Sequence, residues 1–168
     1  CNVKDVVDIV PIKEGLTNTS FKFTCHDNDY VYRHPGIGTD KYICRQSEAY
    51  SMEVAKELDL DGTFIYMDEN EGWKISRYIA NCHILNYHDP DEVEEALRMV
   101  KKLHGSQLTS KWDFNIWKKT NDFVTLVADT PNRMDFEDFD KLYELMKSVY
   151  DCTEADIFPK ILCHCDCY

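Results

Sequence analysis

Hydrophobic and polar positions alternate along much of the first half of the chain, which is the spacing of half-buried β-strands. Apolar side chains occupy every second position of residues 20–25, and the acidic and amide residues at 26–29 are typical of a turn. Helical spacing replaces the alternation at 40–58, and Gly62 follows as a stop signal. The pattern predicts an inserted helix at 40–58 and strands at 6–11, 20–25, 30–33, 63–67 and 73–79.

The second half of the chain follows helical spacing. A helix is predicted up to Gly105, because Asp89 suits the N-cap and Pro90 the first helical position. Two further helices are predicted at 115–128 and 135–150, and the short apolar run 158–165 predicts a strand or an extended loop. Apolar positions mark one face of the first helix at Val93, Leu97, Val100 and Leu103, and the buried face of the last at Phe139, Leu142, Met146 and Val149.

This order of elements predicts an α+β fold. An antiparallel sheet lobe with one inserted helix would occupy residues 1–80, and a partial helical lobe would occupy residues 81–168. We expect the boundary between the lobes near residues 78–88.

Composition narrows the class of protein. Of 168 residues 43% are hydrophobic and 30% are charged, which is typical of a globular chain with a real core. The net charge of −12 argues against nucleic-acid binding, because an acidic surface repels a phosphate backbone. The apolar runs are too short to span a membrane and the first residues lack the pattern of a secretory signal, so we expect a cytoplasmic protein.

Eight cysteines invite a comparison with disulfide or zinc proteins, but the chain contains no CxxC pair. Cys163, Cys165 and Cys167 alternate with His164 and Asp166, which would place the three thiols on one side of an extended chain. A zinc-binding domain built on these residues is an alternative, and reduced thiols are the preferred interpretation.

Two features of the sheet lobe are typical of phosphate binding. The turn from Gly15 to Ser20 combines a glycine with hydroxyl and amide side chains, and it is either a phosphate-cradling loop or a plain hairpin turn. Arg33 ends a predicted strand and Glu48 lies in the helix that follows, so the two are either surface charges or a cation oriented by a carboxylate. A rigid turn at 34–39 joins them, which favours the pair.

Several runs then occur in the order in which they occur in one family. The chain resembles bacterial choline kinases, within the aminoglycoside-phosphotransferase and protein-kinase-like superfamily. The matching runs are 14–21, 30–39 with Arg45 and Glu48, 75–79, Leu103-His104-Gly105, and Leu162-Cys163-His164-Cys165-Asp166, the last resembling the opening of a His-x-Asp catalytic loop.

The resemblance implies a protein-kinase-like fold and the phosphorylation of choline or a related small amino alcohol by ATP and Mg²⁺. Asp166 would be the catalytic base and His164 would brace its loop, whereas His104 would be structural. ATP would be bound by the phosphate loop, by a cation that Glu48 orients, and by the hinge. The residues assigned to the nucleotide in this way are Gly15, Thr17, Asn18, Thr19, Arg33, Glu48, Arg77 and Ile79.

The chain ends at Tyr168, before the position where the family places a metal-binding asparagine, so we expect an inactive fragment of a kinase. The exposed apolar surface of a partial helical lobe would favour a homodimer. Two alternatives stay open, namely a nucleotide-binding module without catalysis, and a kinase for ethanolamine, an aminoglycoside or a sugar.

Overall fold

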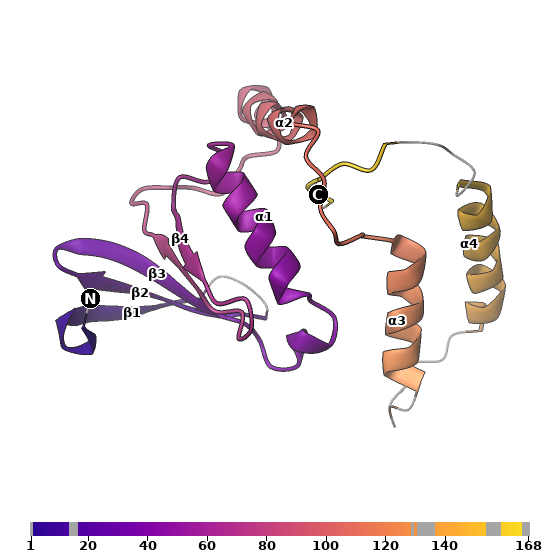
Figure 1. Ribbon diagram of the computed structural model, residues 1–168, viewed down its shortest axis with the longest axis horizontal. Coiled ribbons are helices and arrows are strands. Elements are labelled where there is room, and N and C mark those ends of the chain that lie inside the picture. The colour runs from indigo at the N-terminus through magenta and orange to yellow at the C-terminus, as the bar shows by residue number, and fades with distance from the viewer. Residues whose placement is uncertain (1, 14–16, 129, 131–136, 154–158, 166–168) are drawn as a thin grey trace. The chain divides into compact units, whose positions relative to one another are not determined.

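The computed structural model describes residues 2–13, 17–128, 130, 137–153 and 159–165 (Figure 1). The chain divides into two compact units. The first, here called the sheet unit, comprises Cys1–Leu108 and Leu162–Tyr168, and the second, the helix unit, comprises Thr109–Ile161. The lobe boundary predicted at residue 80 stays a prediction.

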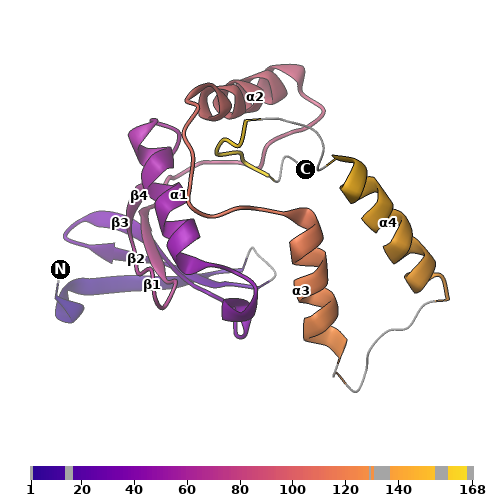
Figure 2. The same cartoon turned by 45° about the vertical axis from the view of Figure 1, so that its right-hand side comes forward.

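The sheet unit is built on five antiparallel strands in the order β1-β2-β3-β5-β4. A single helix, α1 (Arg45–Glu57), is inserted between β3 and β4 and packs against β4, as Figures 1 and 2 show. This arrangement confirms the predicted antiparallel sheet lobe with one inserted helix. The strands are β1 (Val6–Ile12), β2 (Thr19–Cys25), β3 (Asn28–His34), β4 (Phe64–Met67) and β5 (Lys74–Arg77), and two short 3₁₀ helices are η1 (Val3–Asp5) and η2 (Thr39–Lys41).

The turn between β2 and β3 is tighter than predicted. His26 and Asp27 both have positive φ, at 48° and 60°, as a two-residue hairpin turn with the right twist requires. The inserted helix is also shorter than predicted, because residues 39–41 form η2 and α1 begins at Arg45. It ends at Glu57 before Asp59, whose φ of 51° stops the helix ahead of Gly62.

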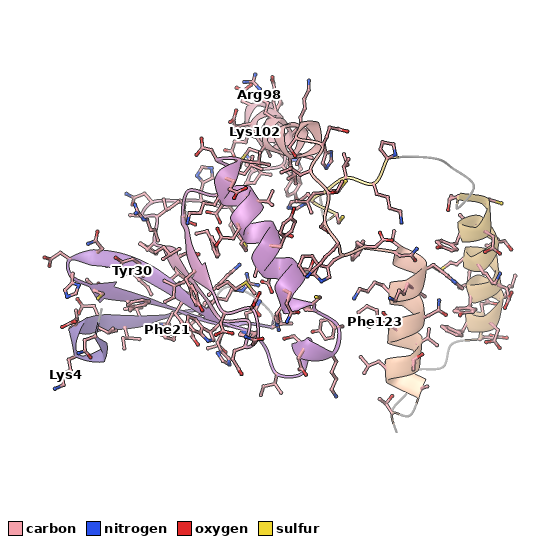
Figure 3. The ribbon with its side chains drawn as sticks, in the orientation of Figure 1. Lys4, Phe21, Tyr30, Arg98, Lys102 and Phe123 are labelled. Carbon is pink, nitrogen blue, oxygen red and sulfur yellow. The ribbon has the colours of Figure 1, made fainter. Side chains whose placement is uncertain are left out.

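The sheet has two different faces, because neighbouring residues of a strand point to opposite sides. The aromatic face carries the rings of Phe21, Phe23, Tyr30, Tyr32, Tyr66 and Trp73. Phe21 stacks on its cross-strand partner Tyr32 at 4.9 Å between ring centroids, and Phe23 stacks on Tyr30 at 5.4 Å. Figure 3 labels one member of each pair, Phe21 and Tyr30. These stacked pairs hold the middle of the sheet together.

The opposite side of the sheet is here called the helix-covered face. It carries Ser20, Lys22, Val31, Arg33, Lys74 and Ser76, which pair with one another across the strands. Two buried residues of this face, Phe64 and Met67, form a small core with Val54 of α1. The face that α1 covers therefore combines a compact apolar core with several charged groups.

Helix α2 (Pro90–Gly105) begins as the sequence predicts. The Asp89 side chain accepts a hydrogen bond of 3.0 Å from the Asp91 N–H, which confirms the N-cap. Near its end, Lys102 Nζ donates to the Asp59 carbonyl oxygen (3.3 Å), which joins α2 to the segment after α1. On its predicted apolar face Leu97 remains 58% exposed.

The end of the described chain forms an extended loop rather than a strand. Leu162 N–H donates to the Leu108 carbonyl oxygen at 2.6 Å, and residues 159–165 contain no regular element. Cys165 has a φ of 62°, so the regular alternation predicted for Cys163 to Cys167 is wrong at this position.

The helix unit consists of α3 (Ile116–Ala128) and α4 (Phe139–Thr153). Trp117 of α3 contacts Tyr143 at 4.8 Å and Tyr150 at 6.0 Å between ring centroids. Because these aromatic residues face α3, the buried face predicted for the last helix is wrong. Its aliphatic members are exposed, at 46% for Leu142, 45% for Met146 and 58% for Val149.

Across the described residues, no helix is both long and apolar enough to cross a membrane.

Candidate functional site

The candidate site starts where the turn before β2 meets the end of β3. With its amide oriented to satisfy the guanidinium, Asn18 accepts hydrogen bonds from Nε (3.0 Å) and Nη2 of Arg33. Thr17 is exposed just before Asn18, and Thr19 begins β2 opposite His34. The structure therefore brings three predicted residues, Thr17, Asn18 and Arg33, to one end of the β2–β3 hairpin.

A close backbone contact fixes the same place. Gly36, just after β3, lies against Thr17, and a Cβ built at position 36 would overlap the Thr17 carbonyl oxygen. A residue with a side chain could fit only if the backbone moved, so glycine is required here for close approach. This contact holds the loop before β2 against the turn that follows Arg33.

The carboxylate of Glu48 does not pair with Arg33, although the sequence analysis predicted this ion pair. Glu48 Oε2 accepts from Arg45 Nη1 at 3.1 Å, and Oε1 lies 3.9 Å from Lys74 Nζ. The reason is the direction of the side chains, because Arg33 is turned toward Asn18 and Lys74 is turned toward α1. Glu48 thus orients a lysine of β5 and an arginine of its own helix.

Lys74 is the member of the site that the sequence analysis missed. It is the cross-strand partner of Arg33 on the helix-covered face. Desolvation by burial lowers the pKa of the Lys74 ammonium, and the positive charge of Arg33 lowers it further, whereas Glu48 and Asp61 oppose these effects. Lys74 lies within the strand predicted at 73–79, but nothing in the local sequence places it opposite Arg33, because the register between β3 and β5 determines that position.

Arg45 ties the site to the elements around it. Its side chain is only 9% exposed and donates to Glu48 and, in a short hydrogen bond, to Thr39 Oγ1. Gly72, with a φ of 79°, leaves room for this guanidinium, since a Cβ there would overlap Arg45 Nε. Arg45 therefore links the start of α1 with η2 and with the turn between β4 and β5.

The predicted hinge residues lie at the end of β5. Arg77 N–H donates to the Thr63 carbonyl oxygen at 2.8 Å, and Tyr78 N–H donates to the Asp29 carbonyl oxygen at 3.0 Å. Ile79 follows, with a side chain 55% exposed. The chain leaves the sheet at this point, and the role of Arg77 and Ile79 at a nucleotide stays a prediction.

The predicted catalytic residues are only partly described. His164 is exposed in the loop after Leu162, while Asp166 and Gly15 lie outside the described residues. The described residues contain no group of three or more His, Cys, Asp or Glu side chains able to hold a metal ion. Cys25 is disulfide-bonded, so the expectation of reduced thiols is wrong for this residue, and the free cysteines among the described residues are Cys44, Cys82, Cys152, Cys163 and Cys165.

Comparison with known proteins identifies the fold. No known protein family and no curated protein matches the sequence. Among solved structures, the choline kinase LicA from Streptococcus pneumoniae matches with a TM-score of 0.74 at 18% identity, covering 89% of this chain and 52% of that chain. A further structure of LicA, in complex with AMP, matches with the same TM-score at 20% identity, covering 89% of this chain and 51% of that chain.

Two other kinases match in the same way. A choline/ethanolamine kinase family protein from Mesorhizobium loti gives a TM-score of 0.70 at 24% identity, covering 96% of this chain and 52% of that chain. An ethanolamine kinase from Plasmodium vivax gives 0.71 at 17% identity, covering 95% and 50%. The chain therefore has a choline kinase-like fold, and it spans about half the length of each of these proteins.

Proposed function

We propose that this chain is the nucleotide-binding part of a small-molecule kinase that transfers the γ-phosphoryl group of ATP to choline or a related amino alcohol. The observation that carries the proposal is the end of the β2–β3 hairpin, where Asn18 holds Arg33 beside the exposed residue Thr17. Arg33 and Lys74 stand opposite each other there, with Glu48 as the nearby carboxylate. An excess of positive charge beside polar loop residues is suited to the phosphates of a nucleotide.

In this proposal the loop formed by Gly15, Thr17, Asn18 and Thr19 covers the phosphates, and the Arg33 guanidinium binds their oxygens. Glu48 positions the ammonium of Lys74 beside these phosphates. The backbone beside Arg77 and Ile79 meets the adenine ring. The fold supports these roles, and so does the similar structure of LicA that was solved in complex with AMP.

The catalytic part of the proposal rests on the loop after Leu162. Asp166 would take the proton of the substrate hydroxyl as the oxygen attacks the γ-phosphorus, and ADP would leave with the bridging oxygen. His164 would brace this loop. The described residues contain no group of three or more His, Cys, Asp or Glu side chains able to hold a metal ion, so Mg²⁺ enters the proposal only as the ion that accompanies ATP and neutralises charge on its phosphates.

The test is choline-dependent ADP release from ATP with Mg²⁺, measured on the complete protein that contains this chain. We expect release that requires choline and falls by about 10²–10⁴-fold in Asp166→Ala. Release with ethanolamine, an aminoglycoside or a sugar in place of choline would keep the kinase and change its substrate. ATP binding without release on any of them would support the non-catalytic module.

A homodimer and a cytoplasmic location belong to the same proposal. The exposed side chains of Leu142, Leu145 and Met146 support self-association, since exposed apolar stripes are commonly covered by a partner. Five free thiols among the described residues support a reducing compartment, with Cys25 as the exception. Light scattering of the purified chain tests the dimer, and a monomer at all concentrations would contradict it.

A further inference from the structure

The pairing of Arg33 with Lys74 is unusual as a structural contact. The two cations are direct cross-strand partners on the helix-covered face of β3 and β5. Like charges directly opposite each other in a sheet are destabilising. The nearest carboxylate, Glu48, is already hydrogen-bonded to Arg45, and the other carboxylate that acts on Lys74, Asp61, has a smaller effect, so positive charge is in excess around Lys74.

Among the described residues, the ammonium of Lys74 lies near a carboxylate but has no strong hydrogen-bond acceptor. Its Nζ lies 3.9 Å from Glu48 Oε1, which is longer than a direct charge-assisted hydrogen bond of about 2.7–2.9 Å. Its other contact is with the Met52 sulfur at 3.5 Å, and a thioether is a weak acceptor. Within the described part of the chain, Lys74 donates no hydrogen bond to an oxygen, although an ammonium has three donors.

The surroundings of Lys74 make a bound anion favourable. Its side chain is 15% exposed, so it is removed from most of the water that would otherwise solvate the charge. Burial and the charge of Arg33 both lower the pKa of the ammonium, which means that the charged form is held at a cost. A multivalent anion that contacts both cations would remove the repulsion between them and supply the missing acceptors.

We propose that Lys74 is a second phosphate-binding cation, held in place by Glu48, and that it and Arg33 bind different phosphate groups of one nucleotide. This inference rests on the proposed function, since it concerns the same site. It gives β5 a role in binding phosphate, whereas the resemblance assigned the phosphates to the loop before β2 and to Arg33 of β3, and gave β5 only the hinge at Arg77. It also predicts that the site distinguishes a triphosphate from a monophosphate, because the two cations are assigned to different phosphate groups and a monophosphate has only one.

The experiment is calorimetric titration of the chain with ATP, AMP and inorganic tripolyphosphate. The variants are Lys74→Met, which keeps the length of the side chain and removes its charge, and Lys74→Arg, which keeps the charge. Lys101→Met is the matched control, because Lys101 is an exposed lysine of α2 outside the site. Thermal unfolding of each variant reports whether the fold is intact.

We expect Lys74→Met to weaken the binding of ATP and of tripolyphosphate by about 10-fold or more, as loss of a hydrogen bond to a charged group implies. AMP binding should change by less than about 3-fold, Lys74→Arg should recover most of the affinity, and Lys101→Met should match the wild type. The thermal midpoint of Lys74→Met should be equal or higher, because a charged group held at a cost is replaced by an apolar one next to Met52.

Four results would overturn all or part of the inference in distinguishable ways. Wild-type affinity for ATP in Lys74→Met would show that only Arg33 contacts the phosphates, and would leave the proposed function standing. Equal losses for ATP and AMP together with a lower thermal midpoint would show a structural role. If the wild type binds neither ATP nor tripolyphosphate, the proposed function and the inference both fail. Binding of tripolyphosphate that depends on Lys74, without binding of ATP, would keep the pair of cations as an anion site and reject the nucleotide as its ligand.

Discussion

The two faces of the five-stranded sheet are built from alternate residues of the same strands, and they are held together by different forces. On the aromatic face, rings stack between neighbouring strands, as in the pairs of Phe21 with Tyr32 and Tyr32 with Trp73. On the helix-covered face, Arg33 and Lys74 stand opposite each other, and Glu48 is the carboxylate that lies nearest to Lys74. One face therefore stabilises the sheet, and in the proposed function the other binds the ligand through its excess positive charge, so each property should respond to substitutions on its own face.

The largest effect is expected from substitution of Glu48, because this carboxylate contacts both the nearly buried Arg45 and the proposed ligand-binding residue Lys74. Glu48→Ala should lower the free energy of unfolding by about 3 kcal/mol, because the nearly buried Arg45 guanidinium loses its carboxylate. Urea denaturation measures this, with Glu53→Ala on the same helix as the control, since Glu53 is exposed. Equal stability of the two variants would show that Arg45 does not depend on Glu48.

Arg33→Ala tests whether the helix-covered face can lose ligand binding without losing stability. We expect ATP affinity to fall by about 10–30-fold, since one charge-assisted contact is removed. Because Arg33 is exposed, the free energy of unfolding should stay within about 0.5 kcal/mol of the wild type. Calorimetric titration and urea denaturation give the two values, with Arg98→Ala of α2 as the control, and a large loss of stability would contradict the separation of the faces.

Phe21→Ala is the reciprocal test on the aromatic face. It should lower the free energy of unfolding by about 1–2 kcal/mol, less than for a fully buried ring, because Phe21 is only half-buried. ATP affinity should remain that of the wild type under conditions where the variant is folded. A weaker binding of ATP by the folded variant would show that the stacked rings position the loop before β2.

The smallest effect concerns pH. The folded pKa of Lys74 lies below its ordinary value of 10.5, so between that lowered pKa and 10.5 the unfolded chain binds more protons than the folded chain. The contribution of Lys74 to stability should therefore rise with pH in this window, and it should be absent in Lys74→Met. Urea midpoints of both proteins over the same pH range test this, and parallel curves would mean that burial of Lys74 does not affect its ionisation.

Local signals in the sequence were sufficient for the strands of the sheet and for the start of α2, but the start of α1 was predicted too early. The turn residues His26 and Asp27 and the cap Asp89 act through their own backbone neighbours, so their roles could be predicted without the fold. The contact between Glu48 and Lys74 could not be predicted in this way, because it depends on the rotation of α1 and on the register between β3 and β5. The aliphatic stripe of α4 failed for a similar reason, since periodicity marks an apolar face without identifying what covers it.

The close approach of Gly36 to the Thr17 carbonyl oxygen has a consequence for motion. Two backbones in contact without an intervening side chain cannot shift past each other without a change in both. The loop before β2 and the turn after β3 should therefore move together as one rigid segment when a ligand arrives. Backbone relaxation measured at Thr17 and at Gly36 would report the same motion, and a nucleotide that orders one would order the other.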